Sequence, residues 1–93
     1  MFNGIIFNKG IINRIKKRAK GVNLFIKSSL KVSNKNLGIS ISCDGVCLTL
    51  ISYKNKTLEF YLSNETLAKS KFRNIKIGDE INLEKPLKFG DNI

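Results

Sequence analysis

Histidine is absent from this 93-residue chain. Without an imidazole there is no Ser-His-Asp arrangement, no histidine-paired cysteine nucleophile and no histidine acid–base catalyst. Acidic residues are few, 7 against 17 lysines and arginines, and no two of them have a spacing that would force them together on one element. The sequence also has no phosphate-binding loop and no dinucleotide-binding fingerprint. A self-contained active site is therefore not expected.

Long apolar runs are also missing. No segment approaches the roughly 20 apolar residues that span a bilayer, so no membrane partner is expected. The apolar start, Met1 to Gly10, has no basic leader and is followed by basic residues, which does not predict a signal peptide. We therefore expect a cytoplasmic protein, and residues 1–93 are expected to form one domain with one modest core.

Cysteine is scarce, with only Cys43 and Cys47. If both lay in one strand, residues four apart would point to the same face about 13 Å apart, too far for a disulfide. Two thiols without histidine fall short of the four ligands that a zinc site needs. Both cysteines are predicted to be reduced, and no metal is expected.

Positive charge is what the chain has in excess, with a formal net charge of +10. Its densest cluster comprises Arg14, Lys16, Lys17, Arg18 and Lys20. Such a cluster could attract phosphates, but it contains no aromatic residue for base stacking before Phe25. Lysine also greatly outnumbers arginine, the residue suited to gripping phosphate. A solvated basic turn is favoured over a nucleic-acid interface.

Short apolar runs separated by turn residues are typical of β-structure. The expected strands cover residues 4–15 with a bend at Gly10, and residues 22–27, 39–42, 46–53, 57–62 and 81–84. Turns are expected at Asp44-Gly45, at 54–56 and at Gly78-Asp79, and Pro86 should end the last strand. Ser63 or Asn64 could cap a short helix that continues to residue 70.

Strands at this spacing, with one short helix and no internal repeat, predict an all-β fold: a small six-stranded antiparallel Greek-key barrel. Closing the barrel removes the exposed edges that so short a sheet would otherwise carry. An OB-like or an SH3-like barrel is also consistent with the pattern.

Two stretches could carry function. In residues 43–49 a turn leads into a strand that should place Cys47 and Thr49 on one face, although core packing is the commoner role for such a cysteine. In residues 63–67 a helix start would gather Ser, Asn, Glu and Thr side chains beside free backbone N–H groups. Such a group of donors and acceptors suits a polyhydroxylated or carbonyl-bearing ligand, although simple helix capping explains the same residues.

Four segments together resemble the riboflavin synthase family. Residues 1–6 resemble its Met-Phe-Thr-Gly-Ile opening, and 44–49 its Asn-Gly-x-Cys-Leu-Thr segment. Residues 63–67 are similar to its Glu-Thr-Leu helix start, and 77–84 to its Val-Gly-Asp-x-Val-Asn-Leu-Glu segment. Each motif is weak alone, but four in register cover the chain from residue 1 to about residue 90.

The resemblance implies a transferase. Members carry two similar barrels, assemble as trimers, and convert two molecules of 6,7-dimethyl-8-ribityllumazine into riboflavin and a ribitylamino-pyrimidinedione without a cofactor. This chain would be the first barrel, with the second absent. By matching position, the substrate-binding residues would be Gly4, Ile5, Ile6, Cys47, Leu48, Thr49, Tyr61, Leu62, Ser63, Asn64, Glu65 and Thr66. Cys47 is also a catalytic candidate, but no catalytic residue is assigned with certainty.

The sequence departs from the family at Asn3, usually Thr, and at Asp44, usually Asn. The family's Gly-His segment would follow the region around residue 90, but the sequence stops at Ile93. We therefore expect this chain alone to bind a ribityllumazine or riboflavin with little or no turnover, and to self-associate as a dimer.

Two alternatives stay open at this point. One is a non-catalytic lumazine- or flavin-binding protein, against which retention of Cys47 argues. The other is a basic nucleic-acid-binding β-barrel, which only the charge favours.

Overall fold

The computed structural model describes residues 5–86 of the chain. Its strands are β1 (Ile5–Arg18), β2 (Gly21–Ser28), β3 (Ser40–Cys43), β4 (Val46–Lys54), β5 (Thr57–Ser63) and β6 (Glu80–Pro86). Helix α1 (Asn64–Lys69) and the 3-10 helix η2 (Lys71–Asn74) join β5 to β6, and a second 3-10 helix, η1 (Asn34–Asn36), lies between β2 and β3. None of these helices is long and apolar enough to cross a membrane.

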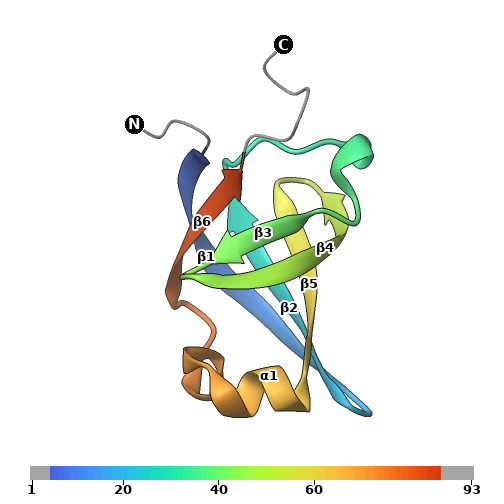
Figure 1. Ribbon diagram of the computed structural model, residues 1–93, viewed down its shortest axis with the longest axis vertical. Coiled ribbons are helices and arrows are strands. Elements are labelled where there is room, and N and C mark those ends of the chain that lie inside the picture. Colours follow the sequence, from blue (N-terminus) through green and yellow to red (C-terminus); the bar gives the residue numbers. More distant parts are fainter. Residues whose placement is uncertain (1–4, 87–93) are drawn as a thin grey trace.

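The six strands close into an antiparallel barrel with the order β1-β2-β5-β4-β3-β6 (Figure 1). Strands β3, β4 and β5 follow one another through hairpins, and β2 lies beside β5 after a long connection to β3. This is Greek-key connectivity. The predicted fold class, an all-β Greek-key barrel with one short helix, is confirmed.

Strand β1 pairs with two other strands. Residues Ile5–Ile11 pair with β6, whereas Gly10–Arg18 pair with β2, so Gly10 and Ile11 belong to both ladders. A Cβ atom on Gly10 would lie 2.4 Å from the Ile26 side chain. Such close packing explains why glycine stands at the predicted bend.

The barrel interior holds one hydrophobic core. Its fully buried large side chains include Leu24 and Ile26 of β2, Leu50 of β4 and Phe60 of β5. Phe72 of η2 is also fully buried, and η2 lies with α1 at one end of the barrel (Figure 1). The segment after β5 therefore covers this end of the core through Phe72.

Two tight turns set the β3–β4 and β4–β5 hairpins. Asp44 and Gly45 have φ values of 50° and 87°, and Asn55 and Lys56 have φ values of 51° and 62°. Positive φ at both central residues is the geometry whose twist matches that of the flanking strands. The predicted turns are confirmed, although the second one holds only Asn55 and Lys56, because β4 continues to Lys54.

Two sequence-based boundaries were wrong. The basic cluster is not a turn: β1 continues to Arg18, and only Ala19 and Lys20 separate it from β2. Pairing with β2 extends the strand through these lysines and arginines, whose low apolar content had suggested a loop. The last strand also runs two residues past Glu84 to Pro86, which pairs with Ile5.

The two cysteines do not share a face. Cys43 ends β3 and is fully buried, whereas Cys47 belongs to β4 and is exposed. The turn at Asp44 reverses the chain between them, so the one-strand spacing used for the prediction does not apply. Both thiols are free. Core packing therefore describes Cys43 and is wrong for Cys47.

Candidate functional site

The ladder between β4 and β5 stops partway along both strands. It runs from the hairpin turn to the pair Leu50–Phe60, with a register shift between Leu50 and Ser52. Within the described residues 5–86, Val46–Thr49 pair only with β3, and Tyr61–Ser63 pair only with β2. We call these two segments, which do not pair with each other, the β4–β5 fork and each of them an arm of the fork. Figure 1 shows β4 following β3 across the barrel while β5 runs to α1.

The fork leaves backbone groups for a ligand. Neighbouring residues of an antiparallel strand direct their N–H and C=O groups to alternate sides. Part of the Val46–Thr49 backbone therefore faces the fork, where β5 no longer pairs with it. Backbone donors and acceptors need partners, and a ligand carrying carbonyl, N–H or hydroxyl groups can supply them.

Side chains of the fork alternate between core and surface. Leu48 and Leu62 point inward and are 4% and 1% exposed. Cys47 and Thr49 lie on one face, as predicted, but this face is the exposed outer one, and Tyr61 is 40% exposed. The outer face of the fork thus offers a thiol, a hydroxyl and a phenol, while the two leucines hold its arms to the core.

Ser63 is the N-cap of α1, which decides between the two predicted caps. Its Oγ accepts a hydrogen bond from the Thr66 N–H at 3.2 Å and lies 3.2 Å from Thr66 Oγ1. The Asn64 N–H donates to the Lys20 carbonyl at 2.9 Å. Two of the first three N–H groups of the helix are therefore already bound, so the expected supply of free donors is smaller than the sequence suggested.

Glu65 lies on the surface in the first turn of α1. Its carboxylate pairs with Lys69 at 3.0 Å, and both side chains are about three-quarters exposed. Helical pairs of this kind stabilise by only about 0.3–0.5 kcal/mol. A ligand hydroxyl could therefore compete for the Glu65 carboxylate at little cost.

Gly21 was not singled out by the sequence. It pairs with Ser63, and a Cβ atom there would lie 2.0 Å from the Leu62 carbonyl oxygen and 2.9 Å from the Tyr61 hydroxyl. Only glycine allows β2 to approach the β5 arm this closely. The available signal was a glycine at the start of a strand, which marks a close backbone approach.

Hydrogen bonds between three polar side chains connect three strands next to the fork. The Glu59 carboxylate accepts hydrogen bonds from Asn23 Nδ2 at 2.5 Å and from Ser52 Oγ at 2.7 Å. Asn23 is only 6% exposed. These bonds tie β2, β5 and β4 together next to the register shift. Sequence reasoning missed them because it described the carboxylates only as scattered.

The N-terminal part of the predicted site lies elsewhere. The backbones of Ile5 and Ile6 pair with Pro86 and Lys85 of β6. In Figure 1 this end of β1 is far from α1. Gly4 lies outside the described residues. Strand pairing thus brings the segments 47–49 and 61–66 to the fork, but not the first residues of β1.

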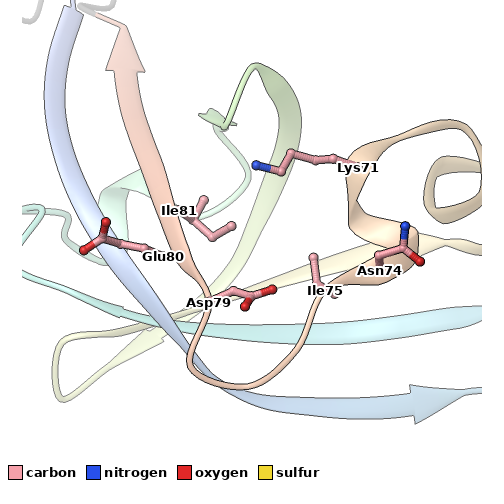
Figure 2. A pocket seen from close by; sticks show the side chains of 6 residues that line it. All are labelled: Lys71, Asn74, Ile75, Asp79, Glu80 and Ile81. Atoms are coloured by element: carbon pink, nitrogen blue, oxygen red, sulfur yellow. The ribbon is translucent and has the colours of Figure 1, made fainter.

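Two surface hollows are not lined by the predicted residues. One, of about 340 Å³, lies between η2 and the start of β6 and is lined by Lys71, Asn74, Ile75, Asp79, Glu80 and Ile81 (Figure 2). Its charged groups are engaged: Lys71 with Asp44, Glu80 with Lys9, and Asp79 with the Lys76 N–H. The other, of about 430 Å³, is lined by Phe25, Ser52, Lys54, Asn55, Thr57 and Glu59.

The basic cluster is exposed along the β1–β2 hairpin. Arg14 lies over the ring of Phe25, with its guanidinium carbon 5.2 Å from the ring centre. Phe25 is thereby covered by a cation from its own sheet, which does not favour its use as a stacking platform for a base.

The fold and the fork together define a Greek-key β-barrel domain whose β4–β5 ladder is interrupted. Residues 3–86 match the family model described as "Lumazine binding domain", and the chain belongs to this family. The description of the family names a small-molecule ligand, in agreement with the expected kind of partner.

Curated relatives of the chain are riboflavin synthases. The enzyme from Chlamydia pneumoniae is 39% identical over 94 residues, covering 100% of this chain and 47% of the relative. The Brucella abortus (strain 2308) enzyme is 36% identical, covering 100% of this chain and 48% of the relative. The Bacillus subtilis (strain 168) enzyme is 31% identical over 94% of this chain and 40% of the relative. The chain spans about half the length of these relatives, and the resemblance to riboflavin synthases is confirmed.

Proposed function

We propose that this chain is the first lumazine-binding barrel of a riboflavin synthase, and that it binds 6,7-dimethyl-8-ribityllumazine or riboflavin at the β4–β5 fork. The main support for the proposal is the position of the motif segments relative to the fork. The segments that resemble the family's ligand-binding motifs, residues 47–49 and 61–66, flank the place where the ladder stops. Ligand contacts and interrupted pairing thus fall at the same point of the barrel.

The fork offers suitable groups for such a ligand. A ribityl chain carries several hydroxyls and the heterocycle carries carbonyls, and each that is buried without a partner costs about 1–3 kcal/mol. Thr49, Thr66 and Glu65 supply hydroxyl and carboxylate partners, and the backbone of β4 supplies N–H and C=O groups. Cys47 and Tyr61 would flank the ring. Ile5 and Ile6, whose backbones pair with β6, are not part of the proposed site at the fork.

The reaction depends more on the positioning of its two substrate molecules than on a catalytic side chain. One lumazine transfers a four-carbon unit to a second, giving riboflavin and the ribitylamino-pyrimidinedione, so the atoms of two substrates balance those of two products. The C7 methyl group of the substrate is itself acidic. Holding two rings face to face can therefore supply much of the rate, by making the step effectively intramolecular.

We further propose that turnover requires a second barrel. With one barrel the fork holds one lumazine, and the second ring has no matching surface. The chain alone would then show little or no dismutation, would pair with a second copy as a dimer, and would form part of a trimeric enzyme when joined to its second half. A cytoplasmic location and the absence of a nucleic-acid partner complete the proposal. The three relatives described above, each a riboflavin synthase, favour this function over a non-catalytic flavin-binding protein.

Titration with riboflavin tests the proposal, because flavin fluorescence reports binding directly. We expect saturable quenching at micromolar ligand. Thr49→Val, which removes an exposed hydroxyl at the fork but keeps a β-branched shape, should weaken binding about five- to tenfold, the loss of roughly one hydrogen bond. Thr57→Val, at the hairpin end of β5, is the matched control and should bind as the wild type does. No quenching by the wild-type chain would refute the proposal.

A further inference from the structure

We propose that the ion pair between Asp44 and Lys71 positions the β4 arm of the fork, an inference that rests on the proposed ligand site. The Asp44 Oδ2 atom lies 2.5 Å from Lys71 Nζ. Its Oδ1 atom accepts a hydrogen bond from the Asn82 N–H at 2.7 Å, and the Asp44 N–H donates to the Asn82 carbonyl at 2.8 Å. One residue thus links the β3–β4 turn to β6 and to η2.

These contacts matter because the β3–β4 hairpin, although anchored to the core through Cys43 and Leu48, has few backbone ladder partners outside its own two strands. On one side, within residues 5–86, the hairpin pairs with β6 through two residue pairs, Ser42–Glu84 and Cys43–Leu83. On the other side, among the residues the structure describes, Val46–Thr49 have no pair in β5. The turn at Asp44 therefore adds restraints on the β4 arm at the place where that arm has no partner in β5.

Lys71 connects that turn to the opposite arm. It begins η2, which follows α1, and α1 in turn follows the β5 arm of the fork. Figure 2 shows the extended Lys71 side chain carrying its amine away from η2. The ion pair thus joins the segment leading into the β4 arm to the segment that follows the β5 arm.

The environment of the pair makes it sensitive to salt. The Asp44 side chain is only 11% exposed, whereas that of Lys71 is 55% exposed. Salt reaches the lysine end and screens the attraction. An asparagine, the residue that the family resemblance leads one to expect at position 44, would keep an acceptor for Asn82 but would carry no charge toward Lys71. The charge-based restraint is therefore a feature of this chain.

Riboflavin affinity at two ionic strengths tests the role, since riboflavin itself is uncharged. We expect the wild-type Kd to rise about two- to fivefold between ~0.01 M and ~1 M salt, the range for a partly exposed pair. At both salt concentrations, Asp44→Asn and Lys71→Met should have the Kd that the wild type has at high salt. The double variant should bind riboflavin no more weakly than either single variant. Lys9→Met, which breaks the Lys9–Glu80 pair away from the fork, is the control and should retain the wild-type Kd.

Amide hydrogen exchange supplies a readout that needs no ligand. Breaking the pair should speed exchange of the Val46–Thr49 amides about two- to fivefold beyond the change in global unfolding measured with urea. Unchanged exchange in both variants, or a Kd in Asp44→Asn equal to that of the wild type at low salt, would overturn the inference. If the wild type does not bind riboflavin, the proposed function fails, and the exchange measurement alone decides the role of the pair.

Discussion

Leu50 of β4 and Phe60 of β5 form the last pair of their ladder, and both side chains are completely buried. One residue further along each strand, Thr49 and Tyr61 turn exposed side chains to the outside. The fork is thus anchored in the hydrophobic core, while its outer side chains contribute little to that core. Ligand contacts and folding can therefore be altered separately, and the following predictions use this separation.

The two thiols should differ in reactivity. Cys47 is exposed and Cys43 is fully buried, so the folded chain should react with an aromatic disulfide reagent at one thiol per chain, and at two after unfolding in urea. Cys47→Ser should abolish the fast reaction, whereas Cys43→Ala should retain it. If riboflavin binds at the fork, saturating ligand should slow the reaction of Cys47. Two fast thiols in the folded chain would contradict the buried position of Cys43.

Alkaline pH should destabilise the fold through Cys43. Burial, with a smaller contribution from the Asp44 charge, raises the pKa of this thiol well above its ordinary value of 9.0. Below that value the thiol is protonated in both states and pH has no effect through this group. Above it the unfolded chain releases a proton that the folded chain keeps, so stability falls as pH rises, by up to about 1.4 kcal/mol per pH unit.

Urea unfolding between neutral pH and about pH 10 measures this linkage. Cys43→Ala should show a shallower loss of stability above pH 9 than the wild type does. Cys47→Ala, which removes the exposed thiol, is the matched control and should keep the wild-type slope. Equal slopes for Cys43→Ala and the wild type would show that Cys43 is not the group responsible.

Removal of the helix cap should destabilise the chain. Ser63→Ala leaves the Thr66 N–H without its side-chain acceptor, which typically costs about 1 kcal/mol. Ser29→Ala, where the hydroxyl donates only to Asn8 on the surface, should change stability by less than about 0.5 kcal/mol. Chemical denaturation of the two variants checks the difference, and equal effects would indicate that the cap contributes nothing specific.

Truncation of Glu59 should lower the stability of the fold, because the buried Asn23 amide would lose its hydrogen-bond acceptor. Glu59→Ala removes the partner of both Asn23 and Ser52, and we expect a loss of about 1–3 kcal/mol because Asn23 stays buried. Glu59→Gln keeps an acceptor oxygen and should lose less. Glu80→Ala, which removes only the exposed pair with Lys9, should cost at most about 1 kcal/mol. A loss for Glu59→Ala no greater than this control would refute the proposed coupling of three strands.

The sequence by itself determined the strands, the turns and the helix cap, because each is encoded by neighbouring residues. Alternation of apolar and polar side chains predicted β2 and β3, Asp44-Gly45 predicted a tight turn, and Ser63 or Asn64 predicted a helix start. The family motifs added a list of candidate ligand contacts. From those local signals, β1 and β6 were predicted to be shorter than they are. Pairing with neighbouring strands extends both of them into segments whose own composition is polar.

Only the tertiary structure decided how those contacts are arranged. The end of the β4–β5 ladder depends on a register shift beside Leu50 and on strands that leave in different directions, and no local pattern contains that information. The same holds for the Glu59 hydrogen bonds, for the approach of Gly21 to Tyr61 and for the Asp44–Lys71 pair, since each joins residues distant in sequence. Alternation fixes which way a side chain points, but pairing between distant strands fixes what stands opposite it.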